Sequence, residues 1–233
     1  MNQHAINLFH IPHASLFSWI KDQFNKYHYD FSKHIIVLEN NSNKQIGYVR
    51  LPLHISLDER LIIHGKETTA MYLTIESGNA AAMVCRGKLI LYHTTFTAYM
   101  ARKRQGFSQI KYLNKKGKSR AGSRVRLAAT TDFFENINHK CSKILETYNI
   151  ERIALNCSTT LLPYLYQSKV PCPFNRKDPK LYKIPIHVPR SNFSNLEKTF
   201  KKLMAPILFF DQKYQTNFCG LVELSKHVTD RTE

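Results

Sequence analysis

One stretch of the chain, residues 101–126, is too basic and too poor in apolar side chains to belong to a hydrophobic core. It contains ten Lys or Arg residues and three glycines, and it has no Asp or Glu. The segments before and after it show the periodicity of ordered strands and helices. The sequence therefore predicts a basic surface loop that is held between two ordered elements.

The charge of the whole chain has the same sign as this stretch. The 233 residues include 34 Lys or Arg against 17 Asp or Glu, which gives a net charge of +17. A charge of that size indicates a polyanionic partner, either nucleic acid or an anionic membrane. No apolar run approaches the roughly 20 residues that span a bilayer, and the N-terminus lacks a basic start followed by an apolar stretch. We therefore expect a soluble, cytoplasmic protein with no membrane partner.

Cysteine and histidine spacing argues against a metal centre. The five cysteines are an odd number without a CxxC pair, which indicates neither a zinc ribbon nor a disulfide framework. His10 and His13 are close in sequence, but Pro12 between them favours an extended turn with surface or half-buried histidines. We expect no metal and no cofactor.

The first 66 residues suggest a helix followed by a hairpin. Apolar residues recur at helical spacing behind Pro12, at Leu16, Phe17, Ile20, Phe24 and Tyr27. Two β-rich runs, His34–Glu39 and Gln45–Leu51, are separated by a polar turn. We expect residues 1–66 to pack on a main domain at 67–207, with residues 208–233 as a C-terminal extension whose structure is ambiguous.

The main domain begins with a meander of three strand-like runs, Thr69–Glu76, Ala80–Cys85 and Leu89–Thr94. Beyond the basic stretch, the pattern alternates between helix and strand. A helix is expected to begin within 123–127, or at a capping box at Asp132, and to end at about residue 148. After it we expect a strand at 150–156, a short helix at 158–167, a strand at 181–188 and a helix that begins at Ser194. This order predicts an α/β fold in which helices pack on a mixed sheet.

A basic run is often only a solvated face or a localisation signal. Three features favour a functional loop here. Glycines at 106, 117 and 122 allow the backbone to approach a phosphate closely, and neutral polar side chains at Gln105, Ser108 and Gln109 stand among the cations. The run also joins two ordered elements.

The loop resembles the signature of a known family. Residues 102–109 read RKRQGFSQ, and residues 117–123 read GKSRAGS. They are similar to the RRKQGGSQ-type segment and the later SAGS-type turn of the Vms-like release factor (VLRF) family. The resemblance extends over about Thr69 to Ala205 and is to the compact, stand-alone bacterial branch. It implies an RNase H-like fold, related to the catalytic domain of eukaryotic class I release factors, and an activity that frees nascent chains from peptidyl-tRNA on stalled large ribosomal subunits.

The resemblance assigns roles residue by residue. Gln109 matches the motif glutamine and is the expected catalytic residue, while Phe107 departs from the usual glycine. The expected partners are the large ribosomal subunit, its RNA and peptidyl-tRNA. The protein itself is expected to be a monomer. The expected RNA-binding residues are Arg102, Lys103, Arg104, Gln105, Gly106, Ser108, Lys111, Lys115, Lys116, Lys118, Arg120, Arg124 and Arg126.

The chemistry of glutamine leaves alternatives open. A neutral amide cannot serve as a general base, so Gln109 would position a nucleophile or stabilise developing charge. The nucleophile is either water attacking the peptidyl ester or a ribose 2′-hydroxyl attacking a phosphate near the tRNA 3′ end. Two other functions stay open: a non-catalytic ribosomal RNA-binding or rescue adaptor, and a nuclease for free tRNA.

Overall fold

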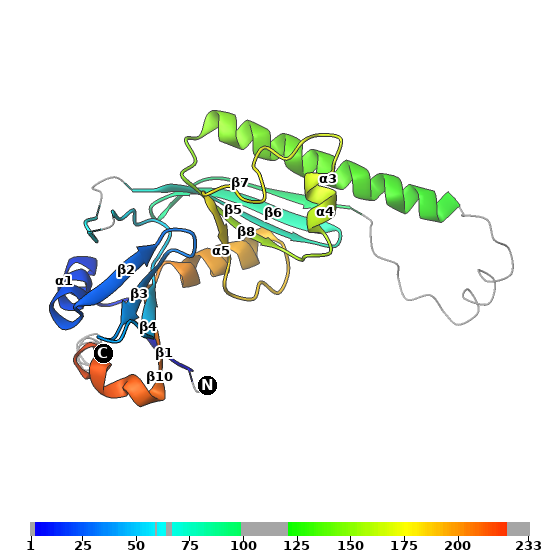
Figure 1. Cartoon of the computed structure of the whole chain (residues 1–233). Helices are drawn as coiled ribbons and strands as arrows, with labels where there is room; N and C mark the ends of the chain where they lie inside the picture. The colour runs from blue at the N-terminus through cyan, green and yellow to red at the C-terminus, as the bar shows by residue number, and fades with distance from the viewer. Residues whose placement is uncertain (1–2, 59, 64–66, 99–120, 223–233) are drawn as a thin grey trace, which may run out of the picture.

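The chain folds around two five-stranded sheets (Figure 1). The computed structural model describes residues 3–58, 60–63, 67–98 and 121–222, with the backbone alone for residues 121–127. The central sheet comes from the middle of the chain. The terminal sheet combines strands from both ends of the chain.

The central sheet is mixed, as predicted. Its strand order is β7-β6-β5-β8-β9, with β5, β8 and β9 parallel and β6 antiparallel to both of its neighbours. This is the strand arrangement of an RNase H-like domain. The bounds are β5 Thr69–Glu76, β6 Asn79–Arg86, β7 Leu89–Thr97, β8 Arg152–Cys157 and β9 Leu181–Lys183. The meander expected from the sequence is confirmed as β5 to β7.

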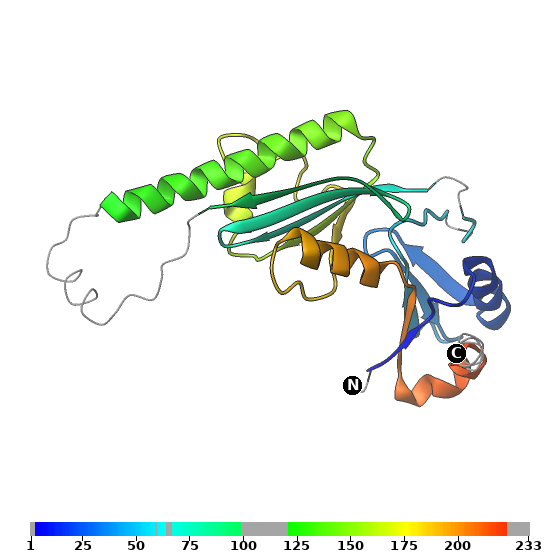
Figure 2. The same ribbon diagram turned by 180° about the vertical axis from the view of Figure 1, so that it is seen from behind.

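Helices cover both faces of the central sheet, which explains why β5 and β6 are almost continuously apolar. On one face lie α3 (Ala121–Thr147) and α4 (Leu162–Tyr166), and on the other lies α5 (Phe193–Leu203) (Figures 1 and 2). The helix α5 buries Leu196, Phe200 and Leu203 at helical spacing.

The terminal sheet is antiparallel, in the order β1-β10-β4-β3-β2. Its strands are β1 Gln3–Asn7, β2 Lys26–Asp30, β3 Ile35–Glu39, β4 Gln45–Arg50 and β10 Ile207–Asp211. The helix α1 (His13–Gln23) and the 3₁₀ helix η1 (Gln212–Phe218) contribute to the core on one face of this sheet. The stretch after 207, ambiguous in the sequence, thus supplies a strand between β1 and β4. The division of the chain at residues 66 and 207 stays a prediction.

Several expected element ends are wrong, because pairing partners decide them. The first helix ends at Gln23, and Tyr27 lies in β2, where it pairs with Leu38. The strand expected at 181–188 ends at Lys183, two residues before Pro185, which cannot donate to a sheet.

Two expected helix caps are also wrong. Asp132 lies inside α3, and the N-cap of α5 is Asn192, whose side chain accepts a hydrogen bond from the Asn195 backbone N–H. The short helix α4 begins after Leu161 without a side-chain cap. In the described part of the chain, no helix is long and apolar enough to cross a bilayer.

A hydrogen-bond network joins the two sheets at Arg152, the first residue of β8. The Arg152 guanidinium donates to the Phe31 carbonyl at 2.6 Å and to the Tyr29 hydroxyl at 2.9 Å. It also lies 3.4 Å from the centroid of the Phe31 ring. Among the described residues, the acceptors of Arg152 are thus neutral groups of the terminal sheet and its turn, and these bonds join the terminal sheet to β8.

His34 completes this network and must be neutral to do so. Its Nε2 lies 2.9 Å from the Pro52 carbonyl and therefore carries the proton, while Nδ1 accepts from the Tyr29 hydroxyl at 2.6 Å. Burial, together with the nearby Arg152 guanidinium, lowers the pKa of His34 to about 3. A second proton would place a cation 3.4 Å from Arg152.

We expect the free energy of unfolding to fall as the pH falls below 6.5. The unfolded histidine has a pKa of 6.5 and takes up a proton there, whereas folded His34 does so only near pH 3. Stability is therefore lost from about pH 6.5 downwards, by about 1.4 kcal/mol per pH unit for this histidine. His34→Asn should remove that part of the slope, because asparagine does not titrate. The substitution also suits the backbone, since asparagine tolerates the φ of 52° found at this position.

Urea titrations between pH 5 and 7 measure this slope, with His10→Asn at an exposed position as the control. His13 and His54 also have lowered pKa values, so some acid sensitivity should remain in the His34 variant. An equal slope in wild type and His34→Asn would contradict the assignment.

Candidate functional site

The expected site lies between the end of β7 at Thr97 and the start of α3 at Ala121. Gln109 and all the expected RNA-binding residues from Arg102 to Arg120 lie outside the described residues. Arg124 and Arg126 belong to the first turns of α3, so the predicted loop is wrong over its last six residues. That part is helical because it contains no proline and leads directly into the helix-forming residues Leu127 and Ala128.

The helix α3 is held firmly against the central sheet. Phe134, Ile137, Cys141 and Ile144 follow one another along its buried face, with at most 3% of each side chain exposed. Burial raises the pKa of the Cys141 thiol far above its usual range, so this cysteine is not a nucleophile. From Phe134 onward, α3 therefore has a fixed place on the central sheet.

Asn138 ties the segment around α4 to this helix. Its side chain is fully buried on the apolar face of α3, and its Nδ2 donates to the Leu165 carbonyl at 2.8 Å and to the Val170 carbonyl at 2.9 Å. These two bonds span the residues that follow α4. The polar residue within an apolar helical stripe was a signal that our sequence analysis missed.

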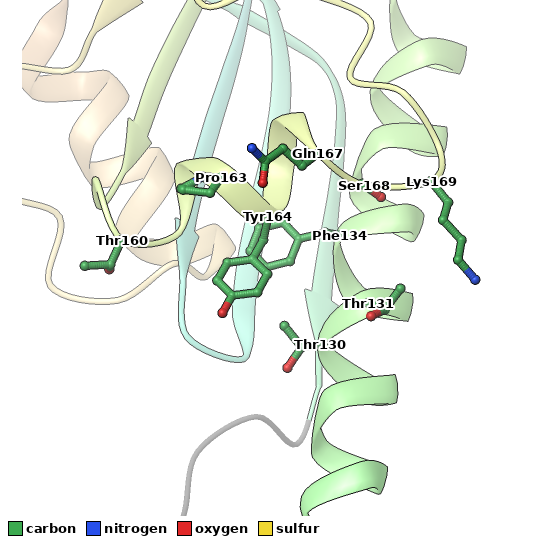
Figure 3. Close-up of a pocket in the computed structure, with 9 residues that line it drawn as sticks. All are labelled: Thr130, Thr131, Phe134, Thr160, Pro163, Tyr164, Gln167, Ser168 and Lys169. Carbon is green, nitrogen blue, oxygen red and sulfur yellow. The ribbon is translucent and has the colours of Figure 1, made fainter.

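A pocket of about 610 Å³ opens between α3 and this segment (Figure 3). Its first residue on α3, Thr130, is about one helical turn beyond Arg126. The pocket is thus close along α3 to the expected RNA-binding residues. It is lined by Thr130, Thr131, Phe134, Thr160, Pro163, Tyr164, Gln167, Ser168 and Lys169.

The lining of this pocket is suited to binding rather than to proton transfer. The rings of Phe134 and Tyr164 stack with centroids 5.7 Å apart, and Tyr164 is 49% exposed. Around them are threonine and serine hydroxyls, the Gln167 amide and the Lys169 ammonium, and the lining has no carboxylate, imidazole or thiol. The Ser168 hydroxyl is buried without a hydrogen-bond partner among the described residues. An aromatic surface beside donors and one cation suits a planar, polar or anionic ligand.

The described residues hold no group of three His, Cys, Asp or Glu side chains that could bind a metal ion. The two histidines considered in the sequence, His10 and His13, lie before and at the start of α1. Of these, His13 has its ring 5.8 Å from that of His54.

Comparison with known proteins identifies a family. The family model described as Bacteroidetes VLRF1 release factor matches residues 70–207, which is more than half of the chain. A solved structure described as the Vms1 mitochondrial localization core is similar at 11% sequence identity, with a TM-score of 0.42 over 82% of this chain and 81% of that one. No curated protein matches the chain in sequence.

We expect Asn138→Asp to destabilise the protein by about 2 kcal/mol, because a buried carboxylate cannot donate to the two carbonyls that the amide now satisfies. Urea denaturation at pH 7 measures the loss. Asn136→Asp makes the same chemical change at an exposed position two residues earlier in α3 and should be nearly neutral. Equal effects of the two substitutions would show that Asn138 does not hold the segment.

Proposed function

Since the chain belongs to the Bacteroidetes VLRF1 release factor family, we propose that it cleaves peptidyl-tRNA and frees nascent chains from stalled large ribosomal subunits in the cytoplasm. The observation that carries the proposal is that the family match spans residues 70–207 and so includes the RKRQGFSQ segment with Gln109. A release factor needs a group that reaches the tRNA acceptor end and a surface that holds RNA. The basic segment supplies both.

Gln109 acts by position in this proposal. Its amide does not titrate, so it takes no proton from the nucleophile. It can instead orient the nucleophile and donate a hydrogen bond to the oxygen on which negative charge develops. The nucleophile is water for ester hydrolysis, or a ribose 2′-hydroxyl for cleavage within the acceptor end.

The basic residues around Gln109 hold the acceptor strand and ribosomal RNA through their phosphates. Such contacts position an RNA without reading its sequence. The pocket beside α3 supports this arrangement, because it offers a nucleotide the exposed Tyr164 ring and the Lys169 ammonium. Neither route calls on a metal ion.

The test is to incubate the protein with stalled large subunits that carry labelled peptidyl-tRNA and to map the 3′ end of the released tRNA. A released peptide with an intact tRNA end identifies ester hydrolysis, and a shortened end identifies phosphodiester cleavage. Binding to the subunit without release would overturn the proposal and leave a binding protein. Naked peptidyl-tRNA serves as the second substrate and should be cleaved much more slowly.

We expect Gln109→Ala to lower the rate of release by about a hundredfold or more, which is the loss seen when one preorganised donor is removed. Subunit binding and the unfolding midpoint should stay near wild type. Gln105→Ala makes the same change four residues earlier and should lower release only a few-fold. Release by the Gln109 variant within a few-fold of wild type would contradict the catalytic role.

Binding to RNA should be steeply salt-dependent, because ten cations in residues 101–126 can displace many counterions. Reversing charge at Arg102 and Arg104 should lower the slope of log K against log salt by about 2. Fluorescence titrations of a tRNA acceptor-stem hairpin at several salt concentrations measure it. Reversal at the exposed Lys21 and Lys143 changes the net charge equally and is the control. A wild-type slope in the loop variant would show that RNA binds elsewhere.

A further inference from the structure

The terminal sheet has one face that is not part of the core around α1 and η1. Val37, Tyr48 and Phe209 lie in direct cross-strand register on this face. In the next row, Arg50 stands opposite Ile35 on one side and Ile207 on the other. The opposite face contributes Ile36, Leu38, Val49, Leu208 and Phe210 to the core. The two rows therefore form a second, separate surface.

A pocket of about 740 Å³ lies over this surface. Its floor is formed by Tyr48, Phe209 and Arg50, and its far side by the end of β9 and the residues that follow, including Tyr182 and Lys183. The pocket thus lies between the terminal sheet and the central sheet. It has no lining residue in common with the pocket beside α3.

Arg50 is buried there without a counter-charge. Only 5% of the residue is exposed, and its Nε makes no hydrogen bond with the described residues. Its guanidinium reaches one carbonyl, that of Lys202, at 3.5 Å. In the described part of the chain no carboxylate lies within ion-pair distance of it. Arginine stays protonated, so this is a buried cation with unused donors.

The contrast with Arg152 shows that the fold can satisfy such a group. Arg152 is equally buried, with 4% exposed, but donates to the Phe31 carbonyl and the Tyr29 hydroxyl. Among the described residues Arg50 has only the Lys202 carbonyl as an acceptor, and its guanidinium carbon lies 6.0 Å from the centroid of the Phe209 ring. Since burying an unpaired cation is unfavourable, an anionic ligand from outside would supply the missing partner.

The other lining residues narrow the class of anion. The rings of Tyr48 and Phe209 stack with centroids 4.9 Å apart and an interplanar angle of 18°, and both residues are half-buried. Exposed Lys183 and Lys33 lie at the pocket, although Lys33 is already paired with Asp30 at 3.1 Å. Aromatic side chains on a sheet face, next to cations, are the arrangement on which unpaired bases stack.

We propose that this pocket binds a nucleoside phosphate, with the phosphate on Arg50 and Lys183 and the base against the Tyr48–Phe209 pair. The source that we favour is a single-stranded segment of RNA, because the chain carries a net charge of +17. This choice of source rests on the proposed action at the ribosome. The pocket itself is independent of the cleavage reaction and of Gln109.

The test measures binding of three probes by calorimetry: an unstructured RNA hexamer, a free nucleoside monophosphate, and inorganic phosphate. The protein carries charge reversals at Arg102 and Arg104, so that the basic segment contributes less. We expect Arg50→Met to weaken hexamer binding about tenfold, as for one lost charge-assisted contact. Arg190→Met, at an exposed arginine, should leave it unchanged.

Different results of this test identify the source of the nucleoside phosphate and show whether the pocket binds it. Tighter binding of the hexamer than of the monophosphate supports RNA, and equal binding of both supports the pocket with a free nucleotide as its ligand. Binding of none of the probes, or binding that is insensitive to Arg50→Met, overturns the proposal. Gln109→Ala should have no effect here, so failure of the release assay and failure of this site are distinguishable.

Thermal unfolding keeps the proposal testable if binding is weak. Because Arg50 has no counter-charge among the described residues, Arg50→Met should raise or maintain the unfolding midpoint without ligand, and should reduce the increase that the hexamer produces. A purely structural arginine would show the reverse, with a lower midpoint in the variant. That result would contradict a ligand-binding role.

Discussion

The parallel pairing of β5 with β8 at the centre of the central sheet decides where the basic segment is inserted in the fold. Parallel neighbours cannot be joined by a tight turn, so the chain must cross over a face of the sheet before it returns. Here it first adds β6 and β7 outward to the edge, then crosses back as α3 to reach β8. The basic residues are inserted at the point where the chain leaves the edge strand. The insertion therefore lies between the edge strand β7 and the crossover helix α3.

Two buried arginine side chains, those of Arg152 and Arg50, are a second feature that the structure has to accommodate. Arg152 is satisfied by neutral acceptors, and its partner His34 has to stay uncharged for the network to form. Arg50 in β4 has one acceptor among the described residues, the Lys202 carbonyl at 3.5 Å. In a chain with twice as many basic as acidic residues, carboxylates are scarce. Around Arg152, a backbone carbonyl and a phenol hydroxyl therefore take the place of carboxylates.

Local sequence signals predicted the elements whose ends are set locally. Glycines at 78 and 87, both with positive φ, lie at the turns between the three strand-like runs that the sequence indicated. The apolar stripe of α3 was equally readable. By contrast, β10 is a strand because it pairs with β1 and β4 from the other end of the chain, and no local sequence pattern predicts such a pairing.

The candidate sites show the same division. The RKRQGFSQ segment was found from its composition and resemblance, because its residues are adjacent in sequence, although Gln109 itself lies outside the described residues. Both pockets were missed. Each brings together segments that are far apart in the chain, as Arg50 and Tyr182 do in the pocket between the sheets. The spacing of residues along one sequence does not show which distant segments come into contact in the fold.

The relative placement of the two sheets determines how the two candidate RNA contacts are arranged in the molecule. The start of α3 lies at the end of the molecule that is remote from the terminal sheet (Figures 1 and 2). An RNA contact in the pocket between the sheets, together with one at the residues before α3, would fix the orientation of the protein on a large RNA surface better than one basic segment, whose phosphate contacts can slide. The Arg152 network joins the terminal sheet to β8, and so it contributes to the placement of the pocket between the sheets relative to the central sheet and α3.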